Sequence, residues 1–493
     1  MRRLLVAAAA TALVLAGTGT PAQAAPVDGS AGLGDVYYPD YGNGGYDVSH
    51  YDIRLRYWPD QDRLTGTTTI LATAEQDLRS FHLDFVLDVA SVQVNNRPAT
   101  FRREGDHELV VTPARTLTAG QAVTIVVQYS GVPSSKVAAG YTAWIRTPDG
   151  AAAVGEPEEA WWWFPSNDHP SDKATFDVSV AVPDGVEVLS NGVQPRANTR
   201  ELLGWTRWYW RSPDPQATYL AFITIGQYDI TRDVTADGTP VINAYSELLP
   251  DDFDAAARAS VERTAEITDW ETTVFGPWPF NARGGVVTPP NTLGFALENQ
   301  TRPNYSAAFF RGGANTYVVV HENAHQYFGD SVSLEQWRDI WLNEGFASYA
   351  EWLWSEKQGE GTADEVFDFV YATAPDDVWS VPPGDPGVPD LFSNSVYDRG
   401  AMTLHQLRKT VGDDDFFTIL RTWVADHRHG NATTGEFIAL AEKISGQQLD
   451  ELFQAWLFTP AKPEVRTALR KAAPAEPRSW TRIQQAHELL HKD

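Results

Sequence analysis

The sequence predicts an α+β fold in which a domain of β-sheets is followed by a mostly helical domain. Short segments with apolar side chains at every second position, each ended by turn residues, fill the chain from about residue 30 to 240. Beyond about residue 250, apolar side chains recur at helical spacing instead. Period two is typical of half-buried strands, and the spacing i, i+3, i+4 is typical of helices. We therefore expect a β-sandwich or saddle over residues 25–240, a helical domain over 241–463, and a partly helical tail over 464–493.

The strand pattern is clearest in "YDIRLRY", residues 51–57, where aromatic and aliphatic residues alternate with charged ones. The segment "TFDVSVAVPDG", residues 175–185, repeats the alternation and then ends in a Pro-Asp-Gly turn. The segments "HELVVTP", "AVTIVVQYSG", "VEVLSNG" and "ATYLAFITIG" are similar. Many short strands separated by turn residues favour a sandwich or an open saddle of sheets.

Helical spacing begins with "PDDFDAAARASVERTAEITDWETTVFG", which carries Asp251 and Asp252 at its start, where acidic side chains favour a helix dipole. The tail contains a further helical pattern, "WTRIQQAHELLHK". Between these two segments, we expect helices near residues 316–328, 343–358, 400–410, 415–425, 434–443 and 449–457.

The composition narrows the class of protein. The chain has 493 residues, of which 43% are hydrophobic and 21% charged, as in globular proteins with a sizeable core. The formal net charge is −27, so we expect no nucleic-acid partner, because such a surface repels phosphates. The sequence contains no cysteine, so a metal site must use histidine and carboxylate ligands, and a cysteine nucleophile is excluded.

The N-terminus has the pattern of a secretory signal peptide over residues 1–24. Arg2 and Arg3 precede the apolar run "LLVAAAATALVLAG", and "AQA" ending at Ala24 has the small-x-small form of a cleavage site. We therefore expect cleavage near Ala24 and a secreted protein. No later run reaches the roughly 18 apolar residues of a membrane helix, so no membrane span is expected.

The segment "VVVHENAHQYFGD" carries two histidines four residues apart, His321 and His325, with Glu322 directly after the first. On a helix, residues i and i+4 share a face, so both imidazoles can bind one Zn²⁺. Glu322 then lies beside the metal, within reach of a water molecule. The alternative is an ordinary helix that carries two histidines by chance.

A third ligand favours the zinc interpretation. Glu344 lies in "WLNEGFASYAEW", a second helical and mostly apolar segment where an unpaired carboxylate would be costly. Two histidines and one glutamate leave a fourth coordination position for water, which is the pattern of catalytic zinc. We therefore predict one Zn²⁺ per chain, bound by His321, His325 and Glu344.

Three further segments accompany the zinc motif. "LGFALENQTRPNY" contains Ala296, Glu298 and Asn299, and "SVYDRG" contains Tyr397. "GEPEEAWWWFPSNDHPSDKATF" begins with Glu156 followed by proline. Taken singly, these segments read as an edge strand, a packed tyrosine and an acidic turn. Together with the zinc motif, and in the order in which they occur along the chain, they resemble the gluzincin aminopeptidase family, which includes aminopeptidase N and leukotriene hydrolase, over about residues 45–463.

The resemblance implies a thermolysin-like catalytic domain and a set of residue roles. Glu322 would be the general base, and Tyr397 would donate a hydrogen bond to the tetrahedral intermediate. Glu298 and Glu156 would hold the free α-amino group of a peptide. Ala296 and Asn299 would complete the substrate-binding set. The implied function is a secreted zinc metallo-aminopeptidase that removes N-terminal residues through zinc-activated water.

The sequence departs from the family pattern in two ways. Phe295 and Leu297 replace the leading Gly and the Met of the family segment G-A-M-E-N, so we expect a reshaped groove. Larger members carry a helical C-terminal domain that roofs the active site, and we expect this chain to be a short form without it. Two other functions remain open from the sequence, namely a thermolysin-like endopeptidase and an inactive zinc-binding scaffold.

Overall fold

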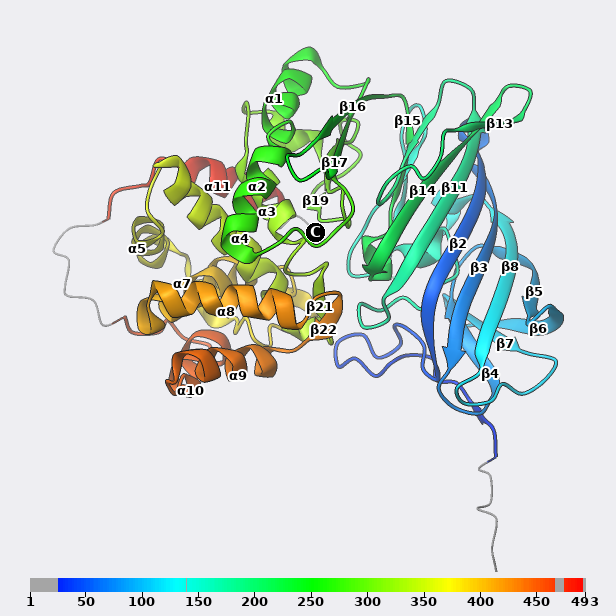
Figure 1. Ribbon diagram of the computed structural model, residues 1–493, viewed down its shortest axis with the longest axis horizontal. Coiled ribbons are helices and arrows are strands. Elements are labelled where there is room, and N and C mark those ends of the chain that lie inside the picture. The colour runs from blue at the N-terminus through cyan, green and yellow to red at the C-terminus, as the bar shows by residue number, and fades with distance from the viewer. Residues whose placement is uncertain (1–24, 139, 466–473, 491–493) are drawn as a thin grey trace, which may run out of the picture.

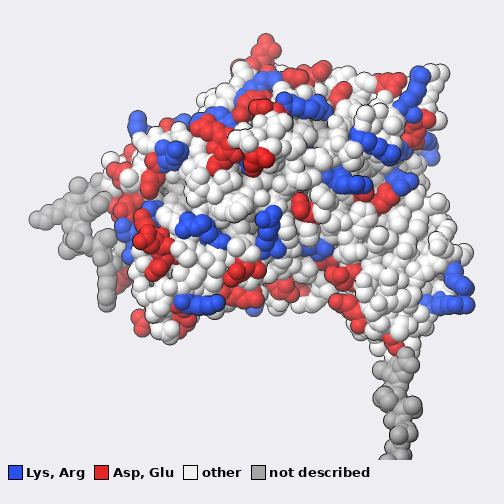
Figure 2. Space-filling view, viewed as in Figure 1, with Lys and Arg blue, Asp and Glu red and all other residues white. Residues whose placement is uncertain are grey.

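The computed structural model describes residues 25–138, 140–465 and 474–490, so the predicted signal peptide lies outside the described residues. The predicted α+β architecture is confirmed. Strands fill the first half of the described chain, and helices cluster together on the opposite side of the molecule (Figure 1). On the face shown in Figure 2, acidic and basic side chains are interspersed. No helix within the described ranges is both long enough and apolar enough to cross a membrane.

The N-terminal domain contains an eleven-stranded sheet whose alternating apolar residues are buried, as predicted. Most neighbouring strands are antiparallel, and a parallel pairing of β2 with β11 joins the two parts of the sheet. In spatial order its strands are β1 (Val27–Asp28), β4 (Leu78–Asp84), β7 (Glu108–Thr112), β6 (Arg97–Glu104), β5 (Asp88–Val94), β8 (Ala122–Gly131), β3 (Arg63–Ala74), β2 (Tyr46–Trp58), β11 (Ala174–Pro183), β14 (Trp205–Gln216) and β13 (Thr199–Leu202).

A second, four-stranded sheet shares one hydrophobic core with the large sheet. Its strands are β12 (Glu187–Leu189), β15 (Ile223–Gly226), β10 (Ala151–Ala153) and β9 (Trp144–Arg146). Trp162 and Trp163 of the "WWW" segment are fully buried in this core. The strand predicted in "ATYLAFITIG" begins only at Ile223, because Thr218–Leu220 form a 3₁₀ turn that buries Tyr219.

A five-stranded sheet leads into the helical domain. Its order is β16 (Tyr228–Val234), β17 (Pro240–Ser246), β18 (Arg283–Val287), β20 (Asn304–Tyr305) and β19 (Ala296–Leu297). The segment "FALEN" is therefore an edge strand. The predicted domain bounds remain a prediction. The pairing of β16 with β17 favours a boundary just before Tyr228 rather than at residue 240.

Helices dominate the remaining described residues. The helical segment expected after residue 250 is two helices, α1 (Asp251–Val261) and α2 (Thr264–Phe275), separated by a break at residues 262–263. The others are α3 (Tyr317–Ala324), α4 (Trp341–Gln358), α5 (Ala363–Thr373), α6 (Asp376–Ser380), α7 (Gly400–Val411), α8 (Asp413–Asp426), α9 (Thr434–Ser445), α10 (Asp450–Phe453) and α11 (Trp480–Leu490). A small parallel pair, β21 (Val332–Leu334) and β22 (Gly430–Ala432), links this domain's loops.

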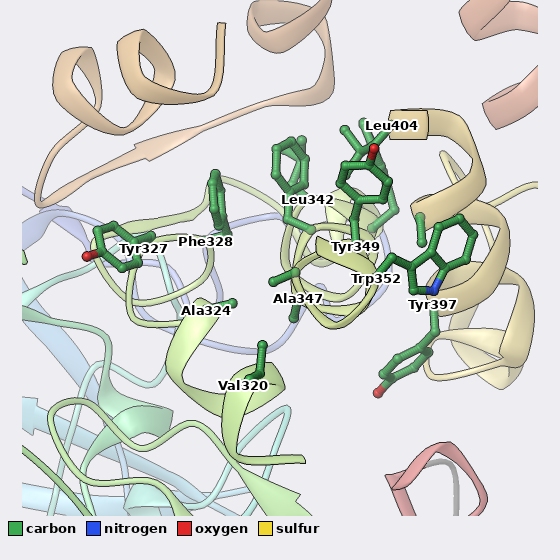
Figure 3. Close-up of a cluster of buried hydrophobic side chains, with 14 of the residues drawn as sticks. Val320, Ala324, Tyr327, Phe328, Leu342, Ala347, Tyr349, Trp352, Tyr397 and Leu404 are labelled. Atoms are coloured by element: carbon green, nitrogen blue, oxygen red, sulfur yellow. The ribbon is translucent and has the colours of Figure 1, made fainter. Parts of the chain in front are cut away.

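The helix that carries the zinc motif is shorter than predicted. It ends at Ala324, with His325 at its C-cap, instead of extending to residue 328. Its side chains pack against α4 inside the helical domain, and Figure 3 shows Val320, Ala324 and Ala347 in this cluster. The two histidines therefore belong to a buried element rather than to a surface helix.

Candidate active site

Three side chains from two elements converge at the centre of the helical domain. His321 lies in the last turn of α3, His325 caps that helix, and Glu344 lies in the first turn of α4. The Nε2 atom of each histidine lies 3.3 Å from Oε2 of Glu344. All three residues are buried.

These separations fit a zinc ion. Zinc binds imidazole nitrogen and carboxylate oxygen at about 2.0–2.2 Å in tetrahedral geometry, which puts neighbouring ligand atoms about 3.3–3.6 Å apart. The Nδ1 atom of His321 donates to Oε1 of Glu351 at 2.7 Å, and Nδ1 of His325 donates to the carbonyl of Phe328 at 3.0 Å. The protons are thus held on Nδ1, and Nε2 of each histidine is free to bind a metal.

Glu351 is itself held by a residue from the far end of the chain. His487 of α11 places Nε2 3.2 Å from Oε1 of Glu351 and Nδ1 3.3 Å from Oδ1 of Asp398. Burial works to lower the pKa of His487, but the two carboxylates raise it to about 10. The sequence did not reveal Glu351 or His487 as site residues. A glutamate seven residues after Glu344, on the same face of α4, was the one available signal for Glu351.

Glu322, directly after His321 in α3, and Tyr397 both lie beside the cluster. Glu322 is buried, and its Oε1 has no hydrogen-bond partner among the described residues. Burial raises the pKa of Glu322 to about 8. Tyr397 comes from a π-helical turn (Ser395–Arg399) that precedes α7, and its ring stacks on the His321 ring at 5.9 Å. Figure 3 shows the Tyr397 ring at the edge of the packed cluster.

Glu298 follows the edge strand β19 and is fixed from two sides. Its Oε1 accepts a hydrogen bond from the Tyr219 hydroxyl at 3.0 Å. Gln326, one residue beyond the second histidine, donates to the carbonyl of Glu298 at 2.7 Å and accepts from the amide of Thr301 at 2.6 Å. The zinc motif and the "FALEN" strand are thereby joined by direct hydrogen bonds. Neither Tyr219 nor Gln326 was predicted from the sequence as a site residue.

Glu156 lies near Glu298 in the same cavity. Its Oε1 has no hydrogen-bond partner in the part of the chain that the structure describes. Burial, and then repulsion by Glu298, raises the pKa of Glu156. Two close carboxylates of this kind attract a cationic group, because a positive charge between them relieves their repulsion.

The cavity has a volume of about 450 Å³ and contains most of the predicted site residues. They are His321, Glu322, His325, Glu344, Glu298, Glu156, Ala296 and Tyr397. The rest of its lining is largely apolar and aromatic, and includes Phe295, Leu297 and Tyr38. Asn299 does not line it, and instead donates to the carbonyl of Leu220 at 3.2 Å. A larger hollow, of about 650 Å³ on the large sheet, contains none of these groups.

A buried pair of histidines and a glutamate on neighbouring helices, in a cavity also lined by two further carboxylates, defines the class of zinc metallopeptidases. Two sequence families match the chain. "Peptidase M1 N-terminal domain" covers residues 48–220 and "Peptidase family M1 domain" covers residues 303–456. The chain belongs to peptidase family M1, which confirms the predicted family and its zinc cofactor.

Relatives and solved structures agree with this assignment. Aminopeptidase M1 of Arabidopsis thaliana is 26% identical over 460 residues, covering 85% of this chain and 51% of its own length. The chain thus spans about half the length of the curated relatives it matches. An M1 zinc metallopeptidase from Deinococcus radiodurans is 28% identical, with a TM-score of 0.79, and covers 89% of this chain and 100% of its own. A mutant of that enzyme bound to a Tyr-Ser-Ala substrate is 28% identical, with a TM-score of 0.77. The match covers 90% of this chain and 100% of the mutant's chain.

Proposed function

We propose that this chain is a zinc aminopeptidase that removes single residues from the free N-terminus of peptides. The observation that carries the proposal is the position of Glu156 and Glu298 in the cavity that also contains the His321–His325–Glu344 cluster. Two carboxylates in a cavity beside a metal site can hold a peptide by its positively charged amino group. The family's relatives named as aminopeptidases support the same conclusion.

The two carboxylates determine which peptide bond is cleaved. In the proposed complex, Glu156 and Glu298 each accept hydrogen bonds from the substrate's α-ammonium group. The Tyr219 hydroxyl, at 3.0 Å from Oε1 of Glu298, keeps that carboxylate turned toward the cavity. Fixing the amino group fixes the first peptide bond at a constant distance from it, so one residue is released per cycle.

His321, His325 and Glu344 would hold the zinc ion. When bound, Zn²⁺ supplies a Lewis acid that polarises the scissile carbonyl and makes water more acidic. Glu322 accepts a proton from the attacking water and returns it to the departing amine. Its Oε1 atom is available for this transfer, because no described residue hydrogen-bonds to it. Tyr397 would donate a hydrogen bond from its hydroxyl to the oxygen of the tetrahedral intermediate.

The side chain of the N-terminal residue would lie against the apolar wall. Phe295 and Leu297 line the cavity directly beside Glu298, together with Tyr38 and Phe392. Aromatic and aliphatic surface of this kind favours apolar or aromatic first residues, since their burial removes nonpolar area from water. Phe295 would limit the size of the residue that fits.

The experiment compares two chromogenic substrates, leucine p-nitroanilide and its N-acetylated form, with and without a chelator. The aminopeptidase account predicts hydrolysis of the free amine alone, lost on chelation and restored by Zn²⁺. Equal hydrolysis of the acetylated compound would instead favour an endopeptidase. An absence of hydrolysis across a panel of aminoacyl and internal peptide substrates, with zinc bound, would favour an inactive scaffold.

We also propose that the protein is exported. The support is the sequence pattern of Arg2 and Arg3, the apolar run that follows them, and the small residues before Ala25. Expression of the full-length gene product, followed by N-terminal sequencing of protein in the culture medium, tests this. A new N-terminus at Ala25 is the expected result, whereas retention of the intact protein inside the cell would refute it.

A further inference from the structure

A second group of buried ionisable side chains lies in the N-terminal domain, outside the proposed active site. Strands β4 and β7 are antiparallel, and their register places Asp84 directly opposite Glu108. Residues paired in this way project from the same face of a sheet, and like charges so placed destabilise it. Both residues are buried, with exposures of 1% and 7%. Such a pair needs a compensating positive charge.

A histidine faces both carboxylates. Nε2 of His107 lies 3.5 Å from Oδ1 of Asp84 and 3.6 Å from Oε1 of Glu108. The same nitrogen lies 3.3 Å from the carbonyl oxygen of Asp40. Neither of the two carboxylate oxygens has a hydrogen-bond partner in the described residues. Three potential metal ligands therefore lie within 4.8 Å of one another, two of them buried, unpartnered oxygens, and the Asp40 carbonyl lies against the histidine nitrogen.

The two separations between the histidine and the carboxylates suit metal ligands. They are 3.5 and 3.6 Å, longer than most N–H···O bonds, whose common length is about 2.9–3.0 Å, whereas the 3.3 Å contact with the Asp40 carbonyl is within hydrogen-bond range. In the proposed zinc cluster, each histidine nitrogen lies 3.3 Å from Glu344 Oε2. A tetrahedral ion with ligands at about 2.0–2.2 Å requires such spacing.

The second oxygen of each carboxylate already has a hydrogen-bond partner. Oδ2 of Asp84 accepts from the side-chain amide of Asn43 and from the backbone amide of Asp168, both at 2.8 Å. Oε2 of Glu108 lies 2.8 Å from Nδ1 of His82. One oxygen of each carboxylate is thus anchored, and the other is turned toward His107. Outer hydrogen bonds orient metal ligands in this manner.

The electrostatics agree with this geometry. Burial lowers the pKa of His107, which favours the neutral form of the imidazole that a metal ion binds. Burial, and then the charge of Glu108, raises the pKa of Asp84. The Trp161 ring packs edge-on against His107 with 3.9 Å between centroids, which shields the group from water.

We propose that Asp84, His107, Glu108 and the carbonyl of Asp40 bind a second divalent cation of the zinc class. An imidazole among the ligands favours Zn²⁺ or a similar transition metal over Ca²⁺ or Mg²⁺, which prefer oxygen ligands throughout. With four protein ligands, the site would be structural rather than catalytic. It would tie the segment around Asp40 to β4 and β7.

The test separates this site from the catalytic one by using a full-length variant with His321→Ala and His325→Ala. After chelator treatment, the protein is dialysed against Zn²⁺, and bound metal is measured by elemental analysis. We expect one zinc per chain, falling to none when Glu108→Gln is added. The matched control is Glu104→Gln, an exposed glutamate opposite Glu108 in the pairing of β6 with β7, which should leave one zinc bound.

Thermal unfolding supplies a second readout that does not depend on stoichiometry. Adding Zn²⁺ should raise the Tm of the His321→Ala/His325→Ala protein and leave the Tm of the Glu108→Gln derivative unchanged, because ligand binding stabilises only the state that binds it. Two results would overturn the proposal. One is the absence of bound zinc and of a Tm shift in the folded double variant. The other is undiminished zinc binding after Glu108→Gln or Asp84→Asn.

Discussion

Gly345 of α4 and Gly400 of α7 meet backbone to backbone. A methyl group added at Gly345 would lie 2.9 Å from Cα of Gly400, and one added at Gly400 would lie 2.8 Å from Cα of Gly345. Real side chains do not approach backbone this closely, so only glycine at both positions permits the crossing. Glu344 directly precedes Gly345, and Tyr397 lies three residues before Gly400. This crossing therefore sets the spacing between a zinc ligand and the proposed oxyanion donor.

Gly400→Ala should lower kcat more than it lowers stability. Overpacking costs about 1–3 kcal/mol, which a protein of this size tolerates. A displacement of α7 by a fraction of an ångström moves Tyr397 relative to the zinc cluster, so we expect kcat to fall about 10- to 100-fold. The measurements are steady-state kinetics and denaturant unfolding.

Gly435→Ala is the matched control for that substitution. It also lies in a helix, α9, but the nearest group to an added methyl is Thr433 Oγ1 at 4.0 Å. It should leave kcat unchanged. Equal kinetics for the Gly400→Ala and Gly435→Ala proteins would show that the crossing does not position Tyr397.

His487→Ala should weaken zinc binding, because His487 holds the glutamate that orients His321. Loss of such an outer partner typically costs about 10- to 100-fold in metal affinity. Competition with a chromogenic chelator measures that affinity directly. Glu488→Ala changes an exposed neighbour on the same helix and should have no effect. Unchanged zinc affinity in the His487→Ala protein would mean that α11 only packs against the domain.

Much of this site was predictable because its key residues are close in sequence or lie in patterned elements. The four-residue spacing of His321 and His325 fixes them on one face of a helix, whatever surrounds it. Glu344 could be selected because a lone carboxylate in an apolar helix needs a partner. The alternating residues of β2 likewise predicted a half-buried strand, which the structure confirms.

The contacts missed from the sequence are those between distant segments. His487 and Glu351 are separated by 136 residues, and no local pattern relates them. Tyr219 resembled a strand residue, but the 3₁₀ turn at 218–220 brings its hydroxyl to Glu298. The end of α3 was misplaced, because Gln326 uses its side chain to bind the "FALEN" strand, a tertiary contact that helical spacing does not reveal.

Glu298→Gln should discriminate between ligands with and without an amino group. The substitution keeps the shape of the side chain and removes its charge. We expect the Ki of leucine hydroxamate to rise about 100-fold, since a buried charge partner is worth several kcal/mol. The Ki of the corresponding desamino hydroxamate should change by less than about threefold. A similar rise for both inhibitors would exclude Glu298 as the amine anchor.

Phe295→Gly should widen the range of accepted N-terminal residues. Phe295 lines the cavity beside Ala296, so its removal enlarges the space available to the first side chain. We expect kcat/KM for tryptophan p-nitroanilide to increase relative to that for alanine p-nitroanilide. The same ratio before and after the substitution would show that Phe295 does not limit the size of the first residue.

The most direct test of the central claim is the zinc content and turnover of the Glu322→Gln protein, measured on the same sample. The account predicts wild-type zinc content with kcat reduced by about 10²–10⁴-fold, because the metal ligands are intact and the general base is lost. Wild-type turnover with zinc bound would contradict the assignment of Glu322, and with it the proposed mechanism.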